Sequence, residues 1–127
     1  MEKIKNAVSW FEIPAADFER AKEFYETIFD YEMHTMEVGP VTLGYLPYDP
    51  GAGGIGGAIA AGEGYAPTLA GALIYLNGGA DLSVVLDRIE EAGGEVVMSK
   101  NLISEDVGYM ALFVDTEGNS VALHSVG

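Results

Sequence analysis

Cysteine is absent from the 127 residues, and basic residues are few. Without cysteine the chain has neither disulfides nor thiolate chemistry, and no apolar signal core follows Met1, so we expect a cytoplasmic protein. Six Lys and Arg against twenty Asp and Glu give a formal net charge of −14. Such a charge repels phosphate backbones and anionic lipid surfaces, so we expect neither nucleic acid nor a membrane as a partner.

Long apolar runs are also missing, although 49% of the residues are hydrophobic. A membrane span needs about 20 consecutive apolar residues, and charge or glycine interrupts every apolar stretch of this chain before that length. The chain is long enough for one well-buried core and too short for two independent domains. We therefore expect a single domain over residues 1–127.

The first half of the chain has the pattern of a strand, a helix and three further strands. Residues 7–13 are rich in β-branched and aromatic side chains and precede Pro14, which is typical of a strand. Asp17 can cap a helix that ends near Asp30, because apolar residues recur there at three- and four-residue spacing. Short strands are predicted next at residues 32–38, 41–48 and 56–61.

The same order of elements begins again in the second half. Residues 72–76 predict a strand, and Asp81 is placed to cap a helix that a left-handed glycine at Gly93 would end. Further strands are predicted at residues 95–98, 109–115 and 120–125. Corresponding residues lie 63 or 64 positions apart, so the pattern predicts two modules, at about residues 5–62 and 68–126.

Two stretches of the sequence carry a family resemblance. They are residues 10–25 (WFEIPAADFERAKEFY) and 113–119 (FVDTEGN). In this order around a duplicated unit, they resemble the vicinal oxygen chelate superfamily, which includes glyoxalases, extradiol dioxygenases and bleomycin-resistance proteins. The resemblance covers essentially the whole chain. It implies an α+β fold of two βαβββ modules, whose curved mixed sheets form a cup within one chain or across a homodimer.

Metal enzymes of that superfamily place one ligand on the first strand and another on the last strand of each module. The resemblance puts these positions at Val8, Gly71, Ala58 and Ala122. None of these side chains can bind a metal ion, so the resemblance implies a member without the metal, and we expect no cofactor. A metal held by His124 and a carboxylate such as Glu12 stays an alternative, although no ligand spacing supports it.

Strand alternation identifies candidate ligand-binding residues on the inner side of the cup. Side chains two residues apart share one face of a strand, and the opposite face of the first strand suits the helix. Alternation identifies Trp10, Glu12, Tyr75 and His124 as candidates. Tyr109 and Tyr45 join them as aromatic residues on later strands of the two modules, where periodicity does not fix the facing. The alternative for the aromatic residues is core or dimer packing, for Glu12 a solvated position, and for His124 a structural histidine.

Two glycine-containing segments need separate interpretation. Residues 51–56 match the pattern G-x-G-x-x-G, but no helix of useful length follows, so we interpret them as a loop and hairpin without a dinucleotide. Residues 100–108 carry mixed charge and are interpreted as a surface connection, with a lid over the cup as the alternative.

These observations favour a metal-free protein that binds a small molecule, of the glyoxalase and bleomycin-resistance type. One alternative is an enzyme, a lyase, isomerase or dioxygenase, that uses Glu12 and His124 as acid and base or a divalent metal at relocated ligands. Another is a purely structural or interaction module. Family analogy alone implies a homodimer.

Overall fold

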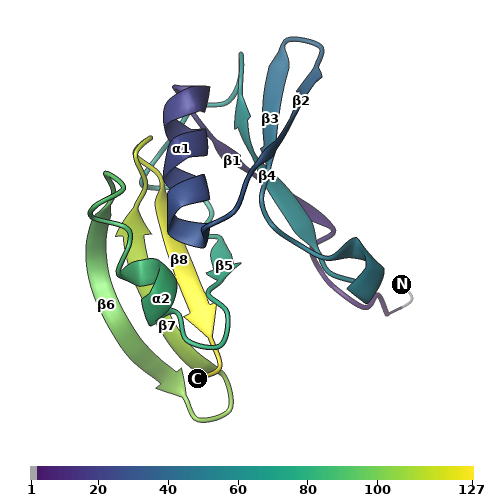
Figure 1. Cartoon of the computed structure of the whole chain (residues 1–127). Coiled ribbons are helices and arrows are strands. Elements are labelled where there is room, and N and C mark those ends of the chain that lie inside the picture. The colour runs from purple at the N-terminus through teal and green to yellow at the C-terminus, as the bar shows by residue number, and fades with distance from the viewer. Residues whose placement is uncertain (1–2) are drawn as a thin grey trace.

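Two four-stranded sheets, each with helical residues on one side, make up the computed structural model, which describes residues 3–127 (Figure 1). The first module consists of β1 (Trp10–Pro14), α1 (Phe18–Phe29), β2 (His34–Val38), β3 (Val41–Tyr45), the short 3-10 helix η1 (Pro50–Ala52) and β4 (Gly56–Ala61). The second module consists of β5 (Tyr75–Asn77), α2 (Ser83–Leu86), β6 (Glu95–Ser104), β7 (Gly108–Val114) and β8 (Ser120–Ser125). The predicted α+β fold of two βαβββ modules is confirmed.

The two sheets have the same topology. Their strand orders are β1-β4-β3-β2 and β5-β8-β7-β6, and in each the first and last strands of the module run parallel. Glu12 lies opposite Ala58 in the first sheet, and Tyr75 lies opposite Ala122 in the second. Glu12 and Tyr75 are 63 positions apart along the chain, and Ala58 and Ala122 are 64 apart, so the two pairs occupy equivalent places in the two modules.

Helix α1 lies where the two modules meet (Figure 1). The Asp17 side chain accepts a hydrogen bond from the backbone N–H of Arg20 and caps the helix start, as predicted. Asp30 ends the helix in the left-handed conformation, with φ 52°. The fully buried Phe24 ring lies 6.0 Å from the Phe113 ring of β7. The apolar stripe of α1 therefore packs against the second module as well as its own sheet.

The second helix is shorter than predicted. Asp81 accepts a hydrogen bond from the N–H of Ser83 at 2.9 Å, and the apolar stripe that begins at Leu82 is buried. After Leu86, however, the chain continues in irregular turns, in which the N–H groups of Arg88 and Ile89 bond carbonyls three residues back and that of Ala92 bonds one four residues back. Acidic side chains at Glu90 and Glu91 are unfavourable near the negative end of a helix dipole, which disfavours a longer helix.

Several strand boundaries also differ from prediction. The first strand begins only at Trp10, and β5 covers residues 75–77. Strand β6 continues to Ser104, so the interpretation of residues 100–108 as a surface connection or lid is wrong for its first half. Pairing with β7 extends β6, and bulges absorb the changes of register between them. Within residues 3–127, no helix is both long and apolar enough to cross a membrane.

The motif at residues 113–119 joins the modules through Asp115. This carboxylate is 4% exposed, and its oxygens accept hydrogen bonds from the Tyr25 hydroxyl at 2.7 Å and from the N–H groups of Glu117 and Asn119 at 2.9 Å. Burial, and secondarily the negative charge of Asp115, raise the pKa of Tyr25 well above its ordinary value. The Tyr25 hydroxyl therefore keeps its proton and donates a hydrogen bond to Asp115.

Glu117 provides a second link between the modules. Its side chain is 1% exposed and accepts hydrogen bonds from the N–H groups of Ala16 and Asp17 and from the Arg20 guanidinium. Burial by itself would raise the pKa of Glu117, but these hydrogen bonds outweigh burial and lower it. The motif that carries the family resemblance is thus a buried polar network at the start of α1.

Candidate functional site

Each sheet leaves one face uncovered by helices, and we call these the open faces. Strand register places on the open face of the first sheet, among others, Trp10, Glu12, His34, Met36, Val38, Val41, Leu43, Tyr45, Ala58 and Ala60. Those of the second sheet include Tyr75, Asn77, Met110, Leu112, Ala122 and His124. The predicted facing of Trp10 and Glu12, and of Tyr75 and His124, therefore agrees with the strand register.

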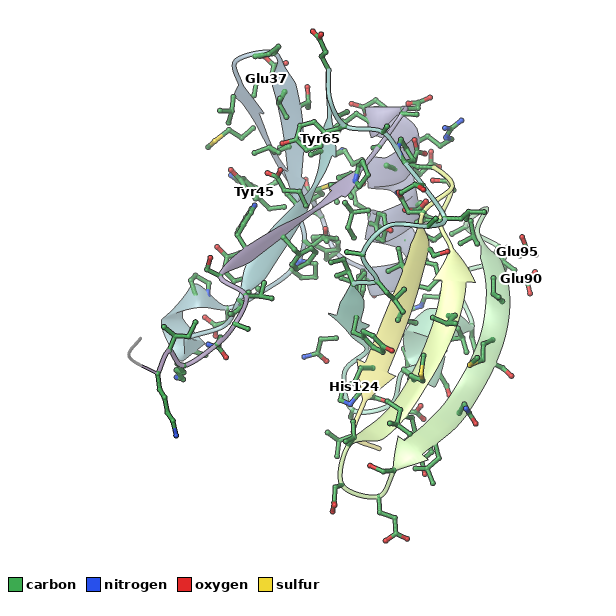
Figure 2. The ribbon with its side chains drawn as sticks, turned by 180° about the vertical axis from the view of Figure 1, so that it is seen from behind. Glu37, Tyr45, Tyr65, Glu90, Glu95 and His124 are labelled. Carbon is green, nitrogen blue, oxygen red and sulfur yellow. The ribbon has the colours of Figure 1, made fainter. Side chains whose placement is uncertain are left out.

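Trp10 and Tyr45 form an aromatic cluster with Tyr48 at the open face of the first sheet. The Trp10 ring makes edge-to-face contacts with Tyr45, at 5.8 Å between centroids, and with Tyr48, at 6.2 Å. Glu12 accepts a hydrogen bond of 2.6 Å from the Tyr65 hydroxyl. This hydrogen bond, with a smaller contribution from burial, raises the pKa of Tyr65. Figure 2 shows Tyr45 and Tyr65 beside the strands of the first sheet.

A cavity of about 460 Å³ lies at the open face of the second sheet. It is lined by Tyr75, Asn77, Ile103, Val107 and His124. Nε2 of His124 lies 2.6 Å from the carbonyl oxygen of Val107. A carbonyl can only accept, so Nε2 carries a hydrogen, and Nδ1 of the neutral ring is then a hydrogen-bond acceptor. The hydroxyl of Tyr75 has only a weak contact, 3.9 Å to the sulfur of Met110.

Tyr109 does not lie on this open face. It pairs with Ser125 in the β7–β8 register, packs against the core, and has the Lys100 ammonium 4.5 Å from its ring centroid. Its side chain therefore points to the opposite side of the sheet from His124. We leave Tyr109 out of the proposed site.

The remaining candidates separate into two groups. Trp10 and Glu12 belong to the first sheet, and Tyr75 and His124 to the second. Glu12 lines a small cavity of about 140 Å³ with Gly71 and other residues, and His124 does not reach it. Glu12 and His124 thus lie on different sheets and line different cavities.

The cavity at the open face also contains residues that sequence reasoning missed. Asn77 follows the predicted strand directly, and extending the alternation from Tyr75 by two residues identifies it. Ile103 and Val107 lie in the segment that we interpreted as a connection. Nothing in their local pattern points to His124, because the long β6–β7 hairpin brings them there.

The superfamily's metal chemistry does not fit the side chains present. Val8 precedes β1, Gly71 lies in the segment before β5, and Ala58 and Ala122 are fully buried in the last strands. None of the four side chains has an oxygen or nitrogen that could bind a metal ion. In the part of the chain that the structure describes, no three His, Asp or Glu side chains gather as a metal site would require. We derive no step through a metal.

The fold and the open faces thus describe a protein of two βαβββ modules, with a cavity large enough for a small molecule at the open face of the second sheet. The family model of the Glyoxalase/Bleomycin resistance protein/Dioxygenase superfamily matches residues 7–123, and the chain belongs to this superfamily. No protein of curated function matches the sequence.

Solved structures with this fold share little sequence with the chain. Glyoxalase I from Zea mays has a TM-score of 0.66 and 16% identity, over 92% of this chain and 43% of that chain. A glyoxylase/bleomycin resistance protein/dioxygenase domain from a Frankia species has a TM-score of 0.66 and 17% identity, over 94% and 91%. The chain therefore spans less than half of the maize enzyme, and identities this low show the fold alone.

Proposed function

We propose that this protein binds a small, largely apolar molecule beside Tyr75 and His124, without a metal ion. The observation that carries the proposal is the cavity of about 460 Å³ at the open face of the second sheet. Ligand sites generally occupy about 300 to 1,000 Å³, with apolar walls and a few convergent polar groups. Ile103 and Val107 supply apolar wall, and Tyr75, Asn77 and His124 supply the polar groups.

The lining indicates what kind of molecule fits. No carboxylate lines the cavity although the chain has twenty acidic residues. The Tyr75 hydroxyl and Asn77 can donate hydrogen bonds, and Nδ1 of a neutral His124 can accept one. These groups favour an apolar molecule that carries both a hydrogen-bond donor and an acceptor. The absence of donor atoms at the four superfamily metal positions supports binding of the bleomycin-resistance type over metal-dependent chemistry.

We also propose that the protein forms a homodimer that covers the open faces. The chain exposes 7643 Å², which is roughly 1,100 Å² more than a compact monomer of its mass exposes. Each partner in a standard interface buries about 800 Å². Trp10, Met36 and Val38 are 38%, 48% and 53% exposed on the first open face. Sedimentation equilibrium at micromolar concentration is expected to give twice the mass of one chain; a monomer would contradict the proposal.

Blocking the cavity beside His124 is expected to abolish ligand-induced stabilisation. A metabolite library is screened for compounds that raise the melting temperature, since a ligand that prefers the folded state stabilises it. At a concentration one hundred times its Kd, a ligand should raise the melting temperature by roughly 5–10 °C. Val107→Trp should remove this shift by filling the cavity.

The matched control for this experiment is Val84→Trp. Val84 is 55% exposed on α2, and Val107 is 48% exposed, so both variants place an indole at an exposed valine. Val84→Trp should keep the full shift. A ligand that stabilises the Val107→Trp variant as strongly as the original protein would show that it binds elsewhere.

A further inference from the structure

A second and separate cavity, of about 490 Å³, lies between the two modules. β1 and β5 are edge strands of their sheets, and the cavity lies between them. Phe11 and Leu46 line it from the first module, and Ile74 and Leu76 line it from the second. Phe11 is on the opposite side of β1 from Trp10 and Glu12. Phe11 thus lines it from the side of β1 that faces away from the first open face, while Tyr75 and Asn77, which belong to the second open face, line both this cavity and the cavity beside His124.

None of the residues that line this cavity is charged. The chain as a whole has twenty acidic and six basic residues, yet this lining, like that of the cavity beside His124, contains no Asp, Glu, Lys or Arg. An ionic molecule would lose hydration on entry and find no opposite charge in compensation. The lining therefore selects uncharged molecules.

Two asparagines supply polar groups in the lining, Asn6 and Asn77. The side-chain oxygen of Asn77 accepts a hydrogen bond of 2.9 Å from the N–H of Gly79. That bond orients the side chain and uses one lone pair of the oxygen, and the amide nitrogen of Asn77 is a hydrogen-bond donor for a ligand. A ligand oxygen that accepts, as in a ketone, ester or ether, matches this group.

The wall formed by β4 depends on a glycine. A Cβ at Gly57 would overlap the Phe11 ring. The ring can therefore lie directly against the β4 backbone, where it leaves the space between the sheets open. Any larger residue at this position would push Phe11 out of that place.

We propose that the cavity between β1 and β5 is a second ligand site, for a neutral and largely apolar molecule that carries a carbonyl or ether oxygen. Its volume lies within the range of small-molecule sites, and its charge-free wall and the Asn77 donor define the chemistry. The proposal does not depend on ligand binding beside His124.

The test uses single cysteines as reporters, because the chain has none of its own. Ala7 lines only the cavity between β1 and β5, and Val107 lines only the cavity beside His124. The full chain with Ala7→Cys or Val107→Cys is alkylated by N-ethylmaleimide, with and without Prodan, a neutral aromatic ketone. Saturating Prodan is expected to slow alkylation at least fivefold for Ala7→Cys and less than twofold for Val107→Cys. Pro47→Cys, also in the first cavity, replaces Ala7→Cys should that variant not fold.

Each other outcome overturns the proposal in a recognisable way. Protection of Val107→Cys alone would place the ketone beside His124, which supports the proposed function and not this second site. Equal protection of both thiols, or of neither, would show that the ketone has no specific place between β1 and β5. An anionic naphthalene sulfonate that protects Ala7→Cys as strongly as Prodan would overturn the selectivity for neutral molecules.

Discussion

Replacing Asp115 with alanine is expected to lower the free energy of unfolding by about 3–5 kcal/mol. The carboxylate accepts hydrogen bonds from the buried Tyr25 hydroxyl, from two backbone N–H groups and from the Asn119 amide. Alanine would leave the Tyr25 hydroxyl and the two backbone N–H groups without this acceptor, next to the core, while the Asn119 amide would keep its bond to the carbonyl oxygen of Pro14. Urea unfolding followed by circular dichroism measures the change, and a loss below about 1 kcal/mol would contradict this account.

Two further variants separate the network from a general effect of removing a carboxylate. Asp106→Ala changes an exposed acidic residue in the β6–β7 turn and should alter stability by less than about 0.5 kcal/mol. Tyr25→Phe removes one donor to Asp115. The double variant with Asp115→Ala should lose about 0.5–3 kcal/mol less free energy of unfolding than the sum of the two single losses, because both changes remove the same hydrogen bond.

Replacing Gly108 with alanine is expected to lower the free energy of unfolding by about 3–5 kcal/mol. Gly108 has φ +104°, a conformation that only glycine adopts readily, and a Cβ there would overlap the carbonyl oxygen of Ser125 and lie 2.8 Å from Cα of Val126. Both obstacles are backbone atoms, one of them in β8, so they cannot rotate away. The same urea unfolding experiment measures the loss.

Gly118→Ala is the matched control for this substitution. Gly118 has φ +96°, and a Cβ there would meet nothing within 4 Å. Gly118→Ala should therefore lower the free energy of unfolding only by the strain of an alanine at positive φ, about 1–2 kcal/mol. Equal losses for the two variants would mean that the steric overlap at Gly108 contributes nothing.

Most elements could be predicted because their signals are local. The cap at Asp17, the apolar spacing of α1 and the repeated order of strands depend on residues close together in sequence. The second helix was predicted too long, since the apolar stripe continues to Ile89 while the backbone tightens into turns after Leu86. Periodicity reports which side chains are buried and not which hydrogen bonds the backbone makes.

The candidate site was predictable only where alternation is clear. Trp10 and Glu12, and Tyr75 and His124, were correctly assigned to common faces, because polar or aromatic residues alternate with core residues there. Every residue from Tyr109 to Val114 is apolar, so alternation could not tell which side Tyr109 faces. Its partner Ser125 in β8 decides this, and register between strands is a tertiary property.

The sequence by itself determined the module order, the acidic charge and the absence of donor atoms at Val8, Gly71, Ala58 and Ala122, because these follow from local patterns and from the atoms of each side chain. Only the tertiary structure decided that the two open faces line separate cavities and that a charge-free cavity lies between β1 and β5. The placement of the modules depends on contacts such as Tyr25 with Asp115, which are 90 positions apart in the chain. No local pattern encodes a contact over that separation.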